Sequence, residues 1–177
     1  MMPRVPNTLM ATVWIVGIVI GATQLPSADA KPARGQPAAA ASTAGATQRI
    51  VSLTNRERAR HGLSALKVDG RCVSAISGHV ADMARNGFLS HQGSDGRDPY
   101  QRYRKYSPSS RGGGENVAYN TSGTAEAFMR QWLNSSIHRS NILNPRFKGI
   151  GVAVRTSCSG HGSAHRCKVY AGQCFSL

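Results

Sequence analysis

The chain beyond residue 47 first carries apolar residues every three or four positions, which is the spacing of helices with one buried face. Residues 47–61 place a few aliphatic side chains among Arg, Glu and Asn, and they predict a helix that ends at His61-Gly62. A second helix is predicted between Asp69 as its N-cap and Gly87 as its C-terminal stop. Its apolar positions are Cys72, Ile76, Val80 and Met83. His79 lies beside them, and we interpret it as a hydrogen-bonded core residue rather than as a ligand.

Three shorter helical segments follow. Asp98-Pro99 has the pattern of an N-cap followed by proline at the first helical position, which predicts a helix through Tyr106. Thr124 can cap another helix, whose apolar side contains Phe128 and Trp132. Residues 137–143 have the pattern of one or two helical turns, which Asn144-Pro145 would end.

The periodicity then changes to that of β-strands. Residues 147–154 predict a mostly buried strand, and residues 166–175 predict its antiparallel partner. A brief extended stretch is expected earlier, at residues 116–120. Because helices come first and an antiparallel sheet comes last, the sequence predicts an α+β fold built in layers.

The N-terminus has the features of an export signal. Arg4 precedes an almost wholly apolar run at residues 9–22, and Ala28-Asp29-Ala30 fits a small-x-small cleavage site. We therefore predict a signal peptide at 1–30, a flexible Ala/Pro/Gly linker at 31–47 and one folded domain at 48–177, secreted or periplasmic, with no transmembrane segment after cleavage. The alternative is an uncleaved anchor, but a bilayer span needs about 20 apolar residues.

Charge points to anionic partners. The formal net charge is +14, and five basic residues follow one another closely in the middle of the chain: Arg97, Arg102, Arg104, Lys105 and Arg111. Such a basic patch would attract an anionic envelope polymer or lipid. Nucleic acid is not expected, because no known binding motif accompanies the charge and the predicted compartment is wrong.

Four cysteines follow the predicted signal, and an even number in an exported chain favours two disulfides. Cys158 and Cys167 flank a Ser/Gly/His-rich tip and would close a hairpin, which leaves Cys72 to meet Cys174. Three pairings are possible, and the sequence alone does not choose among them. A competing interpretation is a Cys₂His₂ zinc site at Cys158-x-x-His161-x-x-x-His165-x-Cys167.

Five motifs occur in an order that resembles the CAP superfamily: cysteine-rich secretory proteins, antigen 5, plant pathogenesis-related proteins and bacterial exported relatives. They are Leu53-x-x-x-x-Arg58-x-x-x-Gly62-Leu63, Ala81 to His91, Gly114-Glu115-Asn116, Trp132 to Asn144, and Tyr170-x-x-Gln173-x-Phe175. The resemblance covers residues 48–177 and is to the bacterial branch. It implies an α-β-α sandwich, in which helices flank a small antiparallel sheet.

The resemblance also implies a cleft that binds a divalent cation in many members, with His91, Glu115 and His138 as the matching side chains. Two imidazoles and one carboxylate would suit Zn²⁺ with one open position. Residues expected to support the cleft are Asn116, Trp132, Asn141, Tyr170 and Gln173. The chain departs from the eukaryotic pattern, since Leu-Asn-Ser follows Trp132 where a second Glu is usual, and Tyr170 replaces a histidine.

Two functions are compatible with these residues. The first is a non-enzymatic extracellular binding module for an envelope component, a lipid or a partner protein. The second is a metal-assisted hydrolase of peptide or cell-wall polymer, in which Glu115 and His138 perform acid/base catalysis. A purely structural role is the third interpretation: Glu115 and Asn116 would lock a turn, and His138 would pack against Trp132. No serine-nucleophile motif and no spare thiol is present.

Overall fold

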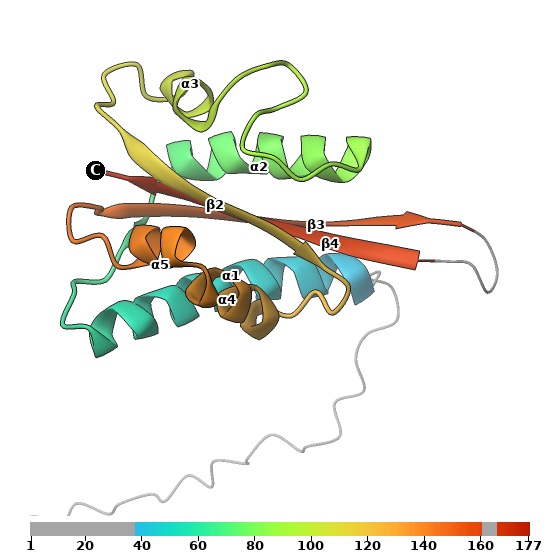
Figure 1. The fold of residues 1–177 in the computed structure, drawn as a ribbon, viewed down its shortest axis with the longest axis horizontal. Helices are drawn as coiled ribbons and strands as arrows, with labels where there is room; N and C mark the ends of the chain where they lie inside the picture. The colour runs from blue at the N-terminus through green and yellow to red at the C-terminus, as the bar shows by residue number, and fades with distance from the viewer. Residues whose placement is uncertain (1–37, 161–165) are drawn as a thin grey trace, which may run out of the picture. The chain divides into compact units, whose positions relative to one another are not determined.

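The computed structural model describes residues 38–160 and 166–177. The predicted signal peptide, the first part of the predicted linker, and His161 and His165 lie outside the described residues. A central sheet separates two layers of helices (Figure 1). No helix within the described ranges is long and apolar enough to cross a membrane.

The sheet has four strands in the order β1-β3-β4-β2. Their bounds are Lys67–Val68, Gly149–Ser159, Arg166–Ser176 and Gly113–Asn120, respectively. The β3–β4 and β4–β2 pairs are antiparallel as expected, whereas β1 pairs with β3 in parallel. The sheet is therefore mixed rather than purely antiparallel, and two residues of β1 are too few to show a strand pattern in the sequence.

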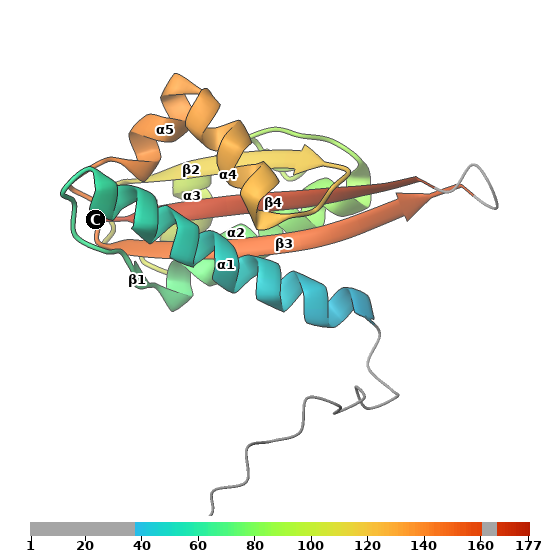
Figure 2. The same ribbon diagram turned by 90° about the horizontal axis from the view of Figure 1, so that it is seen from below.

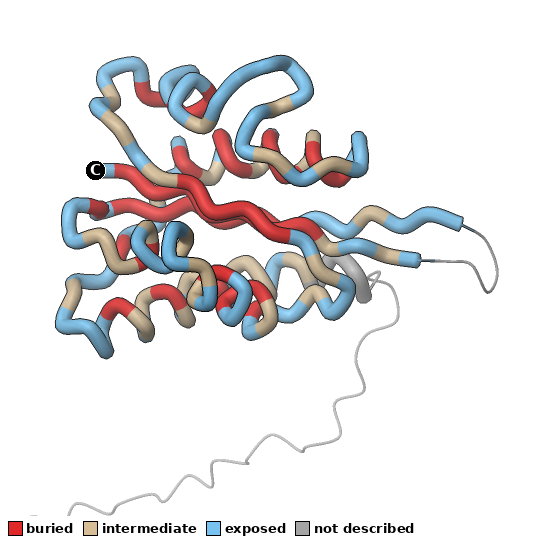
Figure 3. The backbone as a smooth tube through the Cα atoms, in the orientation of Figure 1, coloured by how far each residue is buried: buried red, intermediate tan, exposed pale blue. Residues whose placement is uncertain are grey.

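Helices cover both faces of the sheet, which confirms the α-β-α sandwich (Figures 1 and 2). One face carries α2 (Gly70–Asn86) and α3 (Pro99–Arg104); the other carries α1 (Ala38–Arg60), α4 (Ala125–Asn134) and α5 (Ser136–Ile142). Each face has its own apolar cluster, and only the middle of the sheet is continuously buried (Figure 3). The strands alternate between the clusters with period two.

Close packing of α2 on the sheet depends on two glycines. A side-chain carbon on Gly151 would collide with the backbone of Cys72, and one on Gly172 would lie 2.6 Å from Ile76. The absence of side chains at these positions lets the helix backbone lie directly over β3 and β4. Helix α2 is therefore held close to β4, a strand that also lines the pocket described below.

The helix ends lie where local chemistry predicts them. Asp69 accepts a hydrogen bond from the Arg71 N–H, Asp98 forms a reciprocal capping box with Gln101, and Thr124 accepts from the Ala127 N–H. Gly87 ends α2 in the left-handed conformation, at φ 73°.

The predicted boundary before α1 is wrong, because the helix begins at Ala38 and not near residue 47. Residues 38–47 are therefore helical instead of forming a flexible linker. Their low hydrophobicity suggested a linker, but alanine has the highest helix propensity of all residues.

Two disulfides are formed, and their pairing confirms the expected one. Cys72 on α2 is bonded to Cys174 on β4, and Cys158 is bonded to Cys167 across the β3–β4 hairpin. No described cysteine is free. The competing zinc interpretation is wrong, because the sulfurs of Cys158 and Cys167 are bonded to each other and are not available as thiolate ligands.

Candidate functional site

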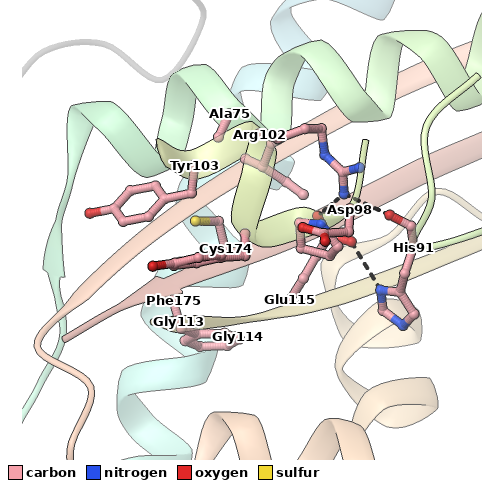
Figure 4. A pocket seen from close by; sticks show the side chains of 13 residues that line it. Ala75, His91, Asp98, Arg102, Tyr103, Gly113, Gly114, Glu115, Cys174 and Phe175 are labelled. Atoms are coloured by element: carbon pink, nitrogen blue, oxygen red, sulfur yellow. Dashed lines mark hydrogen bonds and ion pairs between the residues drawn. The ribbon is translucent and has the colours of Figure 1, made fainter. Parts of the chain in front are cut away.

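Glu115 is the centre of a cluster of charged side chains between β2, α3 and the loop after α2 (Figure 4). Its side chain is only 5% exposed. One carboxylate oxygen, Oε2, accepts a hydrogen bond of 2.7 Å from a terminal nitrogen of Arg102. The other, Oε1, lies 2.9 Å from Nδ1 of His91, whose side chain is half exposed. Both oxygens of this buried carboxylate are thus already bound by donors of this chain.

Arg102 is a site residue and not part of an exposed basic patch. Its guanidinium also donates to the backbone carbonyls of Arg97 and His91, at 2.6 and 2.9 Å, and the residue is buried. Its Nε is buried without a hydrogen-bond partner. The prediction that Arg102 belongs to an exposed basic patch was wrong, because its side chain is buried in an ion pair with Glu115, which is distant in sequence. The other four residues are exposed and form what we call the basic surface: Arg97, Arg104, Lys105 and Arg111.

His79 joins the same cluster from α2. Its Nε2 lies 2.7 Å from the carbonyl oxygen of Ser90 and 3.9 Å from Oε1 of Glu115. A carbonyl only accepts, so Nε2 carries the hydrogen, and the expected hydrogen-bonded core histidine is confirmed. Burial lowers the pKa of His79, the charge of Glu115 partly opposes this, and the charge of Arg102 reinforces it. The imidazole is therefore held neutral.

The expected metal ligands are only partly brought together. His91 contacts Glu115, and the His138 ring faces His91 with 6.4 Å between ring centroids. Burial, and secondarily the neighbouring His91, lower the pKa of His138. Nowhere in residues 38–160 and 166–177 do three or more His, Cys, Asp or Glu side chains form a group that could hold a metal ion. The Arg102 guanidinium occupies one oxygen of Glu115, so a cation at this carboxylate would have to share it with a positive charge.

The side-chain amides expected to support the cleft form a network on the opposite face of β2. Asn116 donates to Gln173 Oε1 and to the His138 carbonyl, both at 3.0 Å. Asn141 donates to Asn116 Oδ1, and Gln173 donates to the hydroxyl of Thr54 on α1. Because Asn116 and Gln173 are fully buried, these bonds fix α1, α5 and β2 relative to one another.

The two aromatic residues expected to support the cleft are buried in the core. Trp132 is fully buried and stacks on Phe128, with 5.8 Å between ring centroids. Tyr170 is 1% exposed and packs against Tyr119 at 5.5 Å. Tyr170 therefore acts as a core residue here.

A pocket of about 360 Å³ lies between α2, α3 and β2, with the charged cluster at one end (Figure 4). Its walls are predominantly apolar and include Ala75, Ile76, Pro99, Tyr103 and Phe175. His91, Asp98, Arg102 and Glu115 supply the polar end. Apolar pockets with a few converging polar groups are typical small-molecule sites.

Each oxygen of Glu115 accepts one hydrogen bond, from Arg102 or from His91, so residues of this chain fix the orientation of the carboxylate. Sequence reasoning missed Arg102 and His79 as members of the cluster. Their link to Glu115 spans 13 and 36 positions, so no local pattern could have shown it.

Comparison with known proteins shows which sequences and folds this chain resembles. The model of the cysteine-rich secretory protein family (CAP) matches residues 51–175. An uncharacterized protein of Bacillus subtilis (strain 168), YkwD, is 34% identical over 112 residues, which are 63% of this chain and 43% of that protein. YlbC, an uncharacterized membrane protein of the same organism, is 34% identical over 60% of this chain and 31% of its own length. The chain thus spans less than half the length of these curated relatives.

Solved structures show the same fold. An extracellular SCP-domain protein from Bacillus anthracis superposes with a TM-score of 0.62 at 31% identity, covering 76% of this chain and 41% of that chain. An outer surface protein from Borrelia burgdorferi has a TM-score of 0.61 at 18% identity, covering 75% of this chain and 92% of that chain. The second likeness concerns the fold alone.

Proposed function

Because this chain belongs to the cysteine-rich secretory protein family, in which it is similar to an extracellular bacterial protein, we propose that it is a non-enzymatic binding module that works outside the membrane. The two disulfides support an oxidising compartment, since such bonds persist in exported proteins. The names of these relatives give no ligand, so the ligand class is argued from the pocket.

The pocket between α2, α3 and β2 carries the proposal. Its apolar walls end on Arg102 and on the half-exposed imidazole of His91, which can form a hydrogen bond with a polar ligand group. The ligand class that fits is an amphipathic molecule with an apolar body and an oxygen-rich head, such as a fatty acid or a related lipid.

The basic surface beside the pocket would bring the domain to such ligands. Arg104 lies over the ring of Tyr100 and Lys105 over that of Tyr106, both at 5.6 Å, and both tyrosines are about two-fifths exposed. Exposed aromatic and cationic side chains together suit an anionic lipid or polymer surface. We propose such an envelope component as the docking partner, and neutralising Arg104 and Lys105 should weaken docking more at low than at high salt.

Hydrolysis is the weaker candidate. No group of metal ligands forms among the described residues, and Glu115 is bound on both oxygens. Zinc binding stays a prediction that this geometry does not favour, and we derive no catalytic step from it.

The test is binding of a fluorescent fatty acid, cis-parinaric acid, to the full chain. Ala75→Leu adds three carbons to the pocket wall and should weaken binding at least tenfold, by occupying volume that the ligand needs. Ser74→Leu makes a comparable change on an exposed neighbour in the same helix and should leave affinity unchanged. Equal affinity of both variants, or no binding by the parent chain, would refute the proposed ligand site.

A further inference from the structure

Strand β2 is an edge strand, since it pairs with β4 and with no other strand of the described sheet. The carbonyl of Ser176 accepts from the Lys148 N–H and therefore faces β3. The backbone N–H and C=O groups of successive residues point to alternate sides of a strand, so those of Gln173 point towards β2. The backbone groups of its partner Asn116 therefore point back towards β4. The backbone N–H and C=O of Val117 must then point outward, away from the sheet.

Side chains already occupy the outward carbonyls on either side of Val117. The Asn141 amide donates to the Glu115 carbonyl at 3.1 Å, and the Gln131 amide donates to the Tyr119 carbonyl at 3.3 Å. These two bonds confirm the outward direction of the odd-numbered residues. Natural sheets cover their edges in such ways to prevent pairing with other chains. Val117 lies between these two bonded carbonyls, and its own backbone N–H and C=O have no hydrogen-bond partner among the described residues.

The open position lies at the bottom of a groove of about 660 Å³. Leu89, which is 45% exposed, forms one wall, and the junction of α4 and α5 with His138 forms the other. Val117 itself is only 6% exposed, so the backbone groups are recessed. Trp132 also lines the groove, and its Nε1–H is buried without a partner in the described structure. The open backbone position at Val117 and the apolar side chain of Leu89 thus line the same groove.

We propose that this groove binds an extended acidic peptide segment of another protein, which adds as a strand to β2 at Val117. Strand addition supplies main-chain hydrogen bonds to an exposed edge, while grooves beside the edge select side chains. The edge of a second copy would bring its own helices against these walls, whereas an extended peptide has none. The net charge of +14 opposes a second copy and attracts an acidic segment.

The chain contains two tryptophans, Trp14 and Trp132. In a Trp14→Phe full chain, Trp132 emission therefore reports directly on the groove. The probe is a capped ten-residue peptide of alternating Val and Glu, compared with the same peptide N-methylated at alternate backbone nitrogens. We expect saturable emission change and slowed amide exchange in residues 113–120. The N-methylated peptide should bind about tenfold more weakly, because it lacks the donors for the edge.

Two matched variants locate the site. Leu89→Glu removes an apolar wall and adds a negative charge, and should weaken binding about tenfold. Val68→Glu makes the same kind of change at an exposed aliphatic residue on β1, the opposite edge of the sheet, and should have little effect. Ala75→Leu should leave peptide binding unchanged, which separates this groove from the fatty-acid pocket.

Three results would overturn the proposal. The first is equal binding of the N-methylated peptide, which would exclude main-chain pairing. The second is equal binding of an alternating Val/Lys peptide, which would exclude selection for acidic segments. The third is a dimer in sedimentation analysis that Leu89→Glu dissociates, which would assign the edge to a second copy of this chain.

Discussion

Removal of the Glu115 charge tests the ion pair on which the site is built. In Glu115→Gln the Arg102 guanidinium stays buried and keeps its two backbone carbonyl partners, but it loses its counter-charge. Breaking a buried pair by removing one partner costs roughly 3–5 kcal/mol. We expect about 3 kcal/mol of unfolding free energy here, at the low end of that range, because the carbonyls still satisfy part of the guanidinium. In a domain of this size that lowers the melting temperature by roughly 10 °C.

The measurement is denaturant and thermal unfolding of four proteins: the parent, Glu115→Gln, Arg102→Met and the double variant. If the pair is coupled, the double variant should be more stable than the sum of the single changes predicts, by at least about 2 kcal/mol. Glu126→Gln is the control, because the Arg49–Glu126 pair has the same kind of contact at 2.9 Å but both side chains are 48% exposed. It should change stability far less. Additive single effects, or a Glu115→Gln cost below about 1 kcal/mol, would refute the reasoning.

Two further predictions concern the disulfides and pH. Replacing Cys72 and Cys174 by Ala should cost about 4.7 kcal/mol, against roughly 2.6 kcal/mol for Cys158 and Cys167, because the bonded residues are 102 and 9 positions apart and loop entropy grows with separation. Equal losses in denaturant unfolding would contradict the loop-entropy account. Burial lowers the pKa of His79 below its ordinary 6.5, so on acidification the unfolded chain takes up this proton first. Stability should therefore fall as the pH drops below about 7 towards the folded-state pKa, and His79→Gln should flatten that slope.

Local chemistry explains why most elements could be predicted from the sequence. The caps Asp69, Asp98 and Thr124 act within three residues of their partners, and Gly87 relieves a strained backbone at one position. Such signals need no knowledge of the rest of the chain. The start of α1 was missed because residues 38–47 lack an apolar pattern, although their alanines favour a helix.

The candidate site could be predicted only in part, because its contacts are distant in sequence. His91 and Glu115 were identified together through motifs, and they do meet. Arg102 was assigned to the exposed basic residues, since α3 has only six residues and too few turns to reveal a buried side. The contact between Glu115 and the Arg102 guanidinium is likewise a property of the assembled layers and not of any segment.

The position of β4 in the sheet has a consequence for how this protein is made. The strand that is synthesised last among the four lies between β3 and β2 and, within the part of the chain that the structure describes, is the only partner of β2. Before residues 166–176 leave the ribosome, neither helical layer has a complete sheet to pack against, and α2 has no Cys174 to join. Folding of both layers must therefore wait for β4, so the sheet closes only when this last strand enters it.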